Sequence, residues 1–178
     1  FLPPASGRQE VLLLGAAGQR IITAGEVLAL AGLLAGLKVS QKSDYDITVL
    51  RGPSLSELIL SPEEIDFTGI KTPTAVLALA PEGVSRRWQA IAELLPESLV
   101  VQAAGVKLPP TEAKVLEADL KAAGFKKADW ALAGLALLAR AERVITLEML
   151  KAALAERFKG PSLEEALRIT DKALALPG

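Results

Sequence analysis

The chain of 178 residues contains no cysteine and no histidine. Without cysteine it cannot form disulfides, cysteine-ligated iron–sulfur clusters or thiolate zinc sites. Without histidine it cannot build a histidine triad or use a histidine general base. A catalytic group on this chain would therefore have to be Asp, Glu, Lys, Arg, Tyr, Ser or Thr. The lack of cysteine also fits the cytoplasm, where we expect the protein to reside.

Aromatic residues and net charge are scarce as well. Aromatics make up 4% of the chain and apolar residues 51%, so Ala, Leu and Val must fill most of the core. The net charge of −1 argues against nucleic-acid binding, which needs a basic face. The most apolar stretch, 21–37, includes Glu26 and three glycines and is short for a membrane span. We interpret it as a buried helix and expect no membrane partner.

Short apolar runs alternate with helical patterns along the first two thirds of the chain. Strands are predicted at 11–14, 37–43, 47–60 (two extended pieces about a Gly52-Pro53 turn), 74–80, 98–105 and 113–120, the last entering a short helix that Gly124 ends. Helices are predicted at 20–36, 86–95, 129–141, 146–158 and 162–176, with a short helical turn at 61–65. Ser162 and Glu165 have the spacing of a capping box. This alternation predicts a single α/β domain over 1–178, with a tail at 1–9, a mainly parallel sheet flanked by helices, and a helical C-terminal third.

The candidate site is the glycine-containing loop between the first strand and the first helix. Open α/β sheets bind ligands at the carboxyl ends of their strands, and free N–H groups at a helix start attract phosphate. Gly15 and Gly18 would let a ligand approach the backbone, and Thr23 could add a hydroxyl. Arg20 opposes the helix dipole unless an anion lies beside it. Either the loop holds an anion, or it is only a tight turn with Arg20 in water.

Known nucleotide fingerprints fit this loop poorly. The pattern G-x-G-x-x-G is broken at Ala17 and Arg20, and no acidic residue stands about 20 positions further on. The P-loop pattern also fails, because no Lys-Ser/Thr pair follows the glycines. A nicotinamide or ATP site therefore has weak support.

A family resemblance becomes visible when the motifs are taken in order. The series “GAAGQRIITAGEVLALA” (15–31), “VLRGPS” (49–54), the apolar run 74–80 and “ADWALAGLALLA” (128–139) resembles the gamma subunit of 2-oxoacid:ferredoxin oxidoreductases. In that family the first motif usually reads G-x-G-G-Q-G-V and the second R-G-G-x-S. The resemblance runs from about residue 10 to 176.

The resemblance implies an enzyme complex whose chemistry belongs mostly to other chains. Such complexes decarboxylate a 2-oxoacid on thiamine diphosphate, pass electrons through iron–sulfur clusters to ferredoxin, and release an acyl-CoA. Alpha, beta and delta parts hold the thiamine and the clusters, so this chain alone is expected to hold no cofactor and no catalytic or metal-binding residue. The gamma part is a Rossmann-like domain that packs on them, with its glycine loop near the pyrophosphate of coenzyme A. An isolated gamma chain could also form a homodimer.

The resemblance also assigns candidate ligand-binding residues, which are Gly15, Gly18, Gln19, Arg20, Thr23, Arg51 and Gly52. Their implied role is to line the crevice near coenzyme A or a neighbouring subunit. The plainer interpretation is that the glycines permit the turn, Gln19 caps the helix and Arg51 makes a structural ion pair. Arg20 departs from the family pattern, and it either meets an anion or fills the crevice.

Two other functions stay open at this point. The chain could be a stand-alone Rossmann-like module that binds coenzyme A or another nucleotide. It could also be a diverged structural subunit without a ligand, because Ala17, Arg20 and Pro53 all replace glycines of the family motifs. The 2-oxoacid itself cannot be read from this chain, because in the family its contacts lie largely on other chains.

Overall fold

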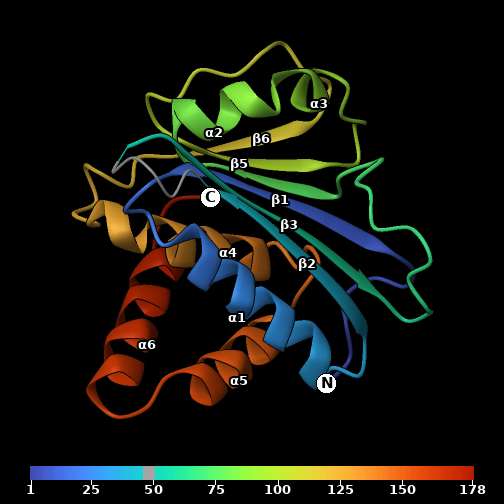
Figure 1. The fold of residues 1–178 in the computed structure, drawn as a ribbon. Coiled ribbons are helices and arrows are strands. Elements are labelled where there is room, and N and C mark those ends of the chain that lie inside the picture. The colour runs from blue at the N-terminus through green and yellow to red at the C-terminus, as the bar shows by residue number, and fades with distance from the viewer. Residues whose placement is uncertain (46–50) are drawn as a thin grey trace.

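The computed structural model describes residues 1–45 and 51–178 (Figure 1). The part of the predicted 47–60 strand pair that falls on 47–50 lies outside the described residues. The strands are β1 (Gln9–Ala16), β2 (Lys38–Tyr45), β3 (Pro53–Ser61), β4 (Ala75–Ala78), β5 (Leu99–Ala103) and β6 (Lys114–Ala118). The helices are α1 (Ile21–Leu34), α2 (Pro81–Arg86), α3 (Trp88–Ala92), a 3-10 turn (Lys127–Asp129), α4 (Trp130–Arg140), α5 (Leu147–Arg157) and α6 (Pro161–Leu174).

The strands form one sheet in the order β2-β3-β1-β4-β5-β6. The pairs β1–β4, β4–β5 and β5–β6 are parallel, whereas β3 runs antiparallel to both β1 and β2. Helices α2 and α3 cover one face of the sheet, and α1, α4, α5 and α6 cover the other (Figure 1). The predicted α/β class, the mainly parallel sheet and the helical C-terminal third are confirmed.

The central strands are apolar because helices cover them on both sides. Val11 to Leu14 of β1 are each at most 1% exposed, as expected for a strand buried on both faces. Helix α1 lies so close to β2 and β3 that a Cβ on Gly25 would be 2.7 Å from Gln41 Nε2. A Cβ on Gly32 would be 2.8 Å from Leu60 Cδ2. Gly25 and Gly32 therefore serve helix-to-sheet packing, whereas Gly36 follows the helix with a φ of +82°.

Two local predictions around the middle of the chain are wrong. Residues 61–65 form no helical turn: Ser61 ends β3, and its hydroxyl accepts a hydrogen bond from the N–H of Glu63 at 3.2 Å. The single helix expected at 86–95 is divided at Arg87, whose φ of −129° lies outside the helical range. Arg87 instead donates from Nε and Nη2 to Glu57 Oε1, at 3.1 and 2.8 Å, which ties this segment to β3.

Two predicted helix boundaries also differ. The Ser162–Glu165 capping box is wrong: Gly160 is the N-cap of α6, and Glu165 accepts hydrogen bonds from Arg168 instead. The segment after β6 contains hydrogen-bonded turns that end at Gly124, in place of a short helix.

The described residues include no helix with the length and apolar character needed to cross a membrane.

Replacement of Gly83 by alanine tests the contact between α2 and β1. A Cβ at Gly83 would lie 2.4 Å from the backbone nitrogen of Gly15, and rigid backbone cannot give way as a side chain can. We expect Gly83→Ala to lower the free energy of unfolding by about 1–3 kcal/mol, although alanine is the better helix former. Ser85→Ala, at an exposed position of the same helix, is the control and should change stability by less than about 0.5 kcal/mol. Urea denaturation measures both, and equal stability of the two variants would contradict the close packing.

Candidate functional site

A crevice lies at the edge of the sheet where the parallel strands end. It has a volume of about 450 Å³. Its lining comes from four connecting segments: 16–19 after β1, 79–82 after β4, 104–106 after β5, and the pair Lys127 and Trp130 at the start of α4. This is the position at which open α/β sheets bind ligands.

The backbone of the glycine loop is largely tied by hydrogen bonds within the chain. The N–H of Ala16 donates to Gln19 Oε1 at 2.9 Å, and the N–H of Gln19 donates to the carbonyl of Ala16 at 3.1 Å. The N–H of Ala17 donates to the carbonyl of Gly52 at 3.0 Å. This last bond joins the loop to the second glycine motif. It also leaves fewer loop donors for a phosphate than the sequence suggested.

Gly18 is the open point of the loop. Its φ of +87° is a backbone conformation that side-chain-bearing residues rarely adopt. In the described part of the chain, no heavy atom lies within 4 Å of a Cβ built on Gly18. Gly15 differs, because a Cβ there would be 2.5 Å from Ile21 Cδ1 and 2.7 Å from Gln19 Oε1. Gly18 thus leaves space for a ligand, whereas Gly15 permits packing beneath the loop.

Gln19 holds the loop against the next strand. Its side chain is buried, and besides accepting from Ala16 it donates from Nε2 to the carbonyl of Leu79 at 3.1 Å. These contacts join the end of β1 to the segment that follows β4. The helix-capping role considered for Gln19 is not what the structure shows, because its acceptor serves the loop and its donor serves the neighbouring strand.

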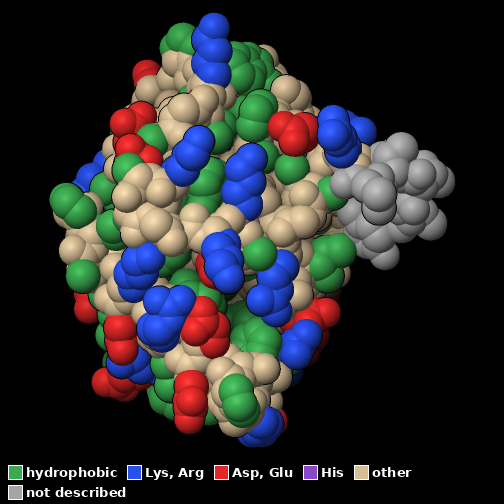
Figure 2. Space-filling model, turned by 90° about the vertical axis from the view of Figure 1, so that its left-hand side faces the viewer, with side chains coloured by type: hydrophobic (Ala, Val, Ile, Leu, Met, Phe, Trp, Pro, Cys, Tyr) green, Lys and Arg blue, Asp and Glu red, His purple; other side chains and the backbone are tan. Residues whose placement is uncertain are grey.

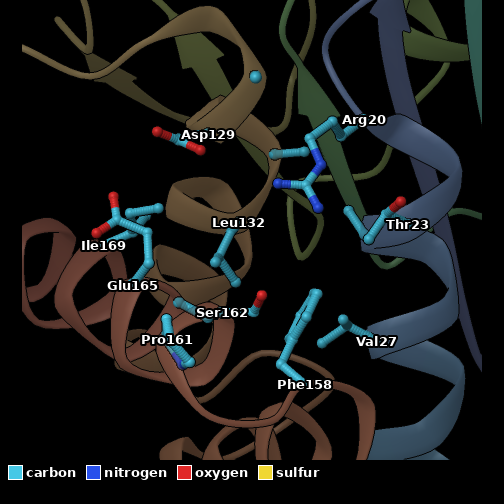
Figure 3. A pocket seen from close by; sticks show the side chains of 14 residues that line it. Arg20, Thr23, Val27, Asp129, Leu132, Phe158, Pro161, Ser162, Glu165 and Ile169 are labelled. Carbon is cyan, nitrogen blue, oxygen red and sulfur yellow. The ribbon is translucent and has the colours of Figure 1, made fainter.

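Arg20 does not fill the crevice above Gly18. It is the N-cap of α1 with a φ of 56°, and its side chain lines a second cavity, between α1, α4 and α6 (Figure 3). The left-handed conformation costs a non-glycine residue about 1–2 kcal/mol. A cation at a helix N-terminus adds a few tenths of a kcal/mol. The ion pairs found among the described residues do not include Arg20.

The predicted site residues therefore divide between two places. Gly15, Gly18 and Gln19 belong to the loop, and Gly52 joins them through the hydrogen bond to Ala17. The neighbouring Arg51 is exposed. Arg20 and Thr23 line the second cavity, which has a volume of about 340 Å³.

Sequence reasoning did not identify Lys127 and Trp130 as parts of the crevice. The Trp130 indole N–H donates to the carbonyl of Phe125 at 3.2 Å, which fixes the ring at the crevice wall. A signal was present, because Trp130 lies in the “ADWALAG” motif and Lys127 immediately precedes it, but only the fold shows that this helix begins beside the glycine loop. No group of three or more Asp or Glu side chains suited to a metal ion occurs in residues 1–45 and 51–178.

The face that carries the crevice is rich in cations. Figure 2 views the molecule from the side on which the parallel strands end, and Lys and Arg side chains gather across the middle of that face. Exposed cations in the segments that follow these strands or precede β3 include Arg20, Arg51, Lys107, Lys121, Lys126 and Lys127, whereas the exposed acids there include Glu82 and Asp119. An anion would be attracted to this face although the whole chain is nearly neutral.

A comparison with known protein families decides the classification. The family described as “Pyruvate ferredoxin/flavodoxin oxidoreductase” matches residues 10–176, nearly the whole chain. The chain belongs to this family. The resemblance seen in the sequence motifs is thereby confirmed.

Curated relatives in the family are archaeal proteins. The 2-oxoglutarate synthase subunit KorC of Archaeoglobus fulgidus is 31% identical over 111 residues, which cover 60% of this chain and 59% of the relative. The subunit of the same name from Methanothermobacter marburgensis is 33% identical over 78 residues, which cover 43% of this chain and 42% of the relative. The matched segments span about half the length of these curated relatives.

Solved structures in the family share the fold. The gamma subunit of a keto/oxoacid ferredoxin oxidoreductase from Geobacter sulfurreducens superposes with a TM-score of 0.78 at 22% identity, covering 95% of each chain. A 2-oxoglutarate:ferredoxin oxidoreductase from Magnetococcus marinus, solved with 2-oxoglutarate, coenzyme A and succinyl-CoA bound, superposes with a TM-score of 0.76 at 21% identity. That match covers 96% of this chain and 31% of the other. The fold therefore occurs both as a separate gamma subunit and within a longer chain.

Replacement of Gln19 by leucine tests the link between the two strand ends. Leucine is close in size but forms neither hydrogen bond, so the Ala16 N–H and the Leu79 carbonyl lose their partner. We expect Gln19→Leu to lower the free energy of unfolding by about 1–3 kcal/mol. Gln89→Leu is the control, because Gln89 is exposed and bonds only to Glu93 on its own segment. Thermal unfolding measures both, and equal midpoints would refute the bridging role.

Replacement of Arg20 by glycine tests the strain at the start of α1. We expect Arg20→Gly to raise the free energy of unfolding by about 1 kcal/mol, because glycine adopts the left-handed conformation freely and carries no opposing charge. Glu142→Gly is the matched control, since Glu142 is exposed and has a φ of 53°. The change in unfolding free energy of Glu142→Gly measures the effect of the left-handed backbone alone, because Glu142 places no cation at the start of a helix. A loss of stability in Arg20→Gly alone would show that Arg20 makes a stabilising contact in the folded chain.

Proposed function

We propose that the chain is the gamma subunit, or a gamma-type domain, of a thiamine-diphosphate-dependent 2-oxoacid:ferredoxin oxidoreductase that works in the cytoplasm. In this role it packs on alpha, beta and delta parts that hold the thiamine and the iron–sulfur clusters, and electrons leave the complex to ferredoxin. The observation that carries the proposal is the crevice above Gly18, at the carboxyl edge of a gamma-type fold. Its ligand in this proposal is coenzyme A.

The crevice suits part of a coenzyme A molecule. Its volume of about 450 Å³ is within the range of small-molecule sites. Gly18 offers close approach to the backbone, and the lining carries the cation of Lys127 together with the carboxylate of Glu82. The apolar wall includes Leu79 and Trp130, against which an adenine or pantetheine segment can pack. These features support an anionic ligand with apolar parts.

The residues of this chain would hold the ligand and take no part in bond making. When bound, coenzyme A supplies the thiol that accepts the acyl group. Lys127 would neutralise part of the pyrophosphate charge, and Arg51 would add to the positive potential at the rim. Gly18 would admit the ligand, while Gln19 keeps the loop in place beneath it. The absence of histidine and cysteine fits a part whose work is binding and orientation.

One observation favours a second function, that of a structural subunit without a ligand. Three N–H groups of the glycine loop, those of Ala16, Ala17 and Gln19, are engaged inside the chain. Binding of a phosphate would therefore depend on the cationic side chains more than on backbone N–H donors. Removal of one such side chain distinguishes the two functions.

We expect Lys127→Gln to raise the KM for coenzyme A by about fivefold, which corresponds to about 1 kcal/mol of lost charge contact, with kcat unchanged. The assay uses the complex assembled with its thiamine- and cluster-binding partners and follows ferredoxin reduction. 2-Oxoglutarate is the first oxoacid to test, because the curated relatives are 2-oxoglutarate synthase subunits.

Lys126→Gln is the matched control, because Lys126 is the exposed neighbour of Lys127 and does not appear in the crevice lining. Lys126→Gln should raise the KM by at most about twofold, because Lys126 adds only to the long-range potential of the face. Equal KM values for all three complexes would favour the structural subunit. A chain that is stabilised by coenzyme A but is not retained by the partner subunits would instead favour a stand-alone binding module.

A further inference from the structure

The second cavity is built as a small-molecule site of its own. It has a volume of about 340 Å³, within the range of ligand pockets, and among the described residues it shares no lining residue with the crevice above Gly18. Its walls are α1, the start of α4, and α6, with Phe158 at one end (Figure 3). Three helices that are separate in the sequence thus enclose one space.

The charged groups that line this cavity point in different directions according to their sign. The guanidinium of Arg20 and the hydroxyl of Ser162 point into the space (Figure 3). The carboxylates of Asp129 and Glu165 point away from its centre (Figure 3). Glu165 accepts two hydrogen bonds from Arg168, at 2.9 and 2.6 Å, and this pairing lowers its pKa and compensates its charge. The hydroxyl of Thr23, another lining residue, points away from the space (Figure 3), so the interior presents the Arg20 cation and the Ser162 hydroxyl to a ligand.

The rest of the lining is apolar. Val27 of α1, Leu132 of α4, Ile169 of α6 and the ring of Phe158 surround the space below Arg20 (Figure 3). An inorganic anion would leave these side chains uncovered, and a hydrocarbon would not pair with the guanidinium of Arg20, an exposed residue at the mouth of the cavity. Only a ligand with both parts satisfies the two halves of the cavity.

We propose that this cavity binds a small monocarboxylate with an apolar body. The carboxylate pairs with the Arg20 guanidinium and accepts from the Ser162 hydroxyl, while the body packs on Val27, Leu132, Ile169 and Phe158. The anion provides the counter-charge that Arg20 lacks among the described ion pairs. Asp129 and Glu165 disfavour a ligand with a second carboxylate at the outer wall. The proposal does not rest on the function proposed above.

The probe is 4-phenylbutanoate, titrated into the full 178-residue chain labelled at its methyl groups for NMR. We expect saturable shifts of the Val27, Leu132 and Ile169 methyls, with a Kd of about 1 mM or below. 4-Phenylbutan-1-ol and 4-phenylbutylamine have the same body without the negative charge, so each should bind at least about tenfold more weakly. Phenylsuccinate tests the preference against a second carboxylate and should also bind more weakly.

Two variants examine the cation and the hydroxyl separately. Arg20→Gln should weaken 4-phenylbutanoate binding by about tenfold or more and leave binding of the alcohol unchanged. Ser162→Ala, at an exposed position in the first turn of α6, should weaken it by about threefold. Arg86→Gln removes an arginine from the opposite helical layer and is the control for nonspecific charge effects.

Three results would overturn the proposal. One is binding of the alcohol or the amine as tight as that of the carboxylate, which would indicate an apolar pocket without charge selection. Another is a set of shifts confined to Leu79 and other crevice residues, which would place the ligand above Gly18. The third is the absence of saturable shifts up to the solubility of the probe. Because no partner subunit, coenzyme A or turnover enters the experiment, its failure and the failure of the proposed function are distinguishable.

Discussion

The Gln19 side chain sets the relative position of two of the segments that line the crevice. It accepts from the loop after β1 and donates to the carbonyl after β4, so two adjacent strands end at a fixed separation. The loop it holds carries Gly18 on one side and Arg20 on the other. The crevice opens above the glycine, and the second cavity begins at the arginine. A polar side chain in the protein interior is retained here because both of its hydrogen bonds are made.

Most of the fold could be predicted from the sequence because its central strands are buried on both faces. Runs such as “VLLL” and “TAVLALA” have no polar face, and that composition distinguishes covered parallel strands from surface strands. The ends of helices and strands were less predictable where contacts made by side chains outweighed the local helix propensity. The Ser61-Pro62 pair has the composition of a helix start, yet the chain there remains extended and bent. The helix is interrupted at Arg87, and the Arg87 side chain forms an ion pair with Glu57. No local sequence pattern predicts this contact, because the two residues are far apart in the sequence.

The candidate site was predicted less completely, and the reason is geometric. Sequence motifs indicated the loop and included Gly52 among the candidate residues, but the hydrogen bond from Ala17 to Gly52 appears only in the structure. They could not show that Arg20 turns away from the crevice, because the direction of a side chain follows from the backbone angle at its own residue. They also could not place Lys127 beside Gly18. That proximity arises only when α4 packs beneath the sheet, more than 100 residues along the chain from the loop.

The hydrogen bond from Ala17 to Gly52 has a consequence for folding. Ala17 precedes α1 and Gly52 follows β2, so the bond closes the loop that contains both elements. The other segments that line the crevice are 79–82, 104–106, and the pair at 127 and 130. Closing such long loops costs chain entropy, so contacts of this kind form after local helices and after the strand pairs closest in sequence. We therefore expect the crevice to form in the late, non-local stage of folding. A nascent chain that has emerged only as far as β4 contains the entire glycine loop but has no crevice, because the other three of its four lining segments have not yet emerged.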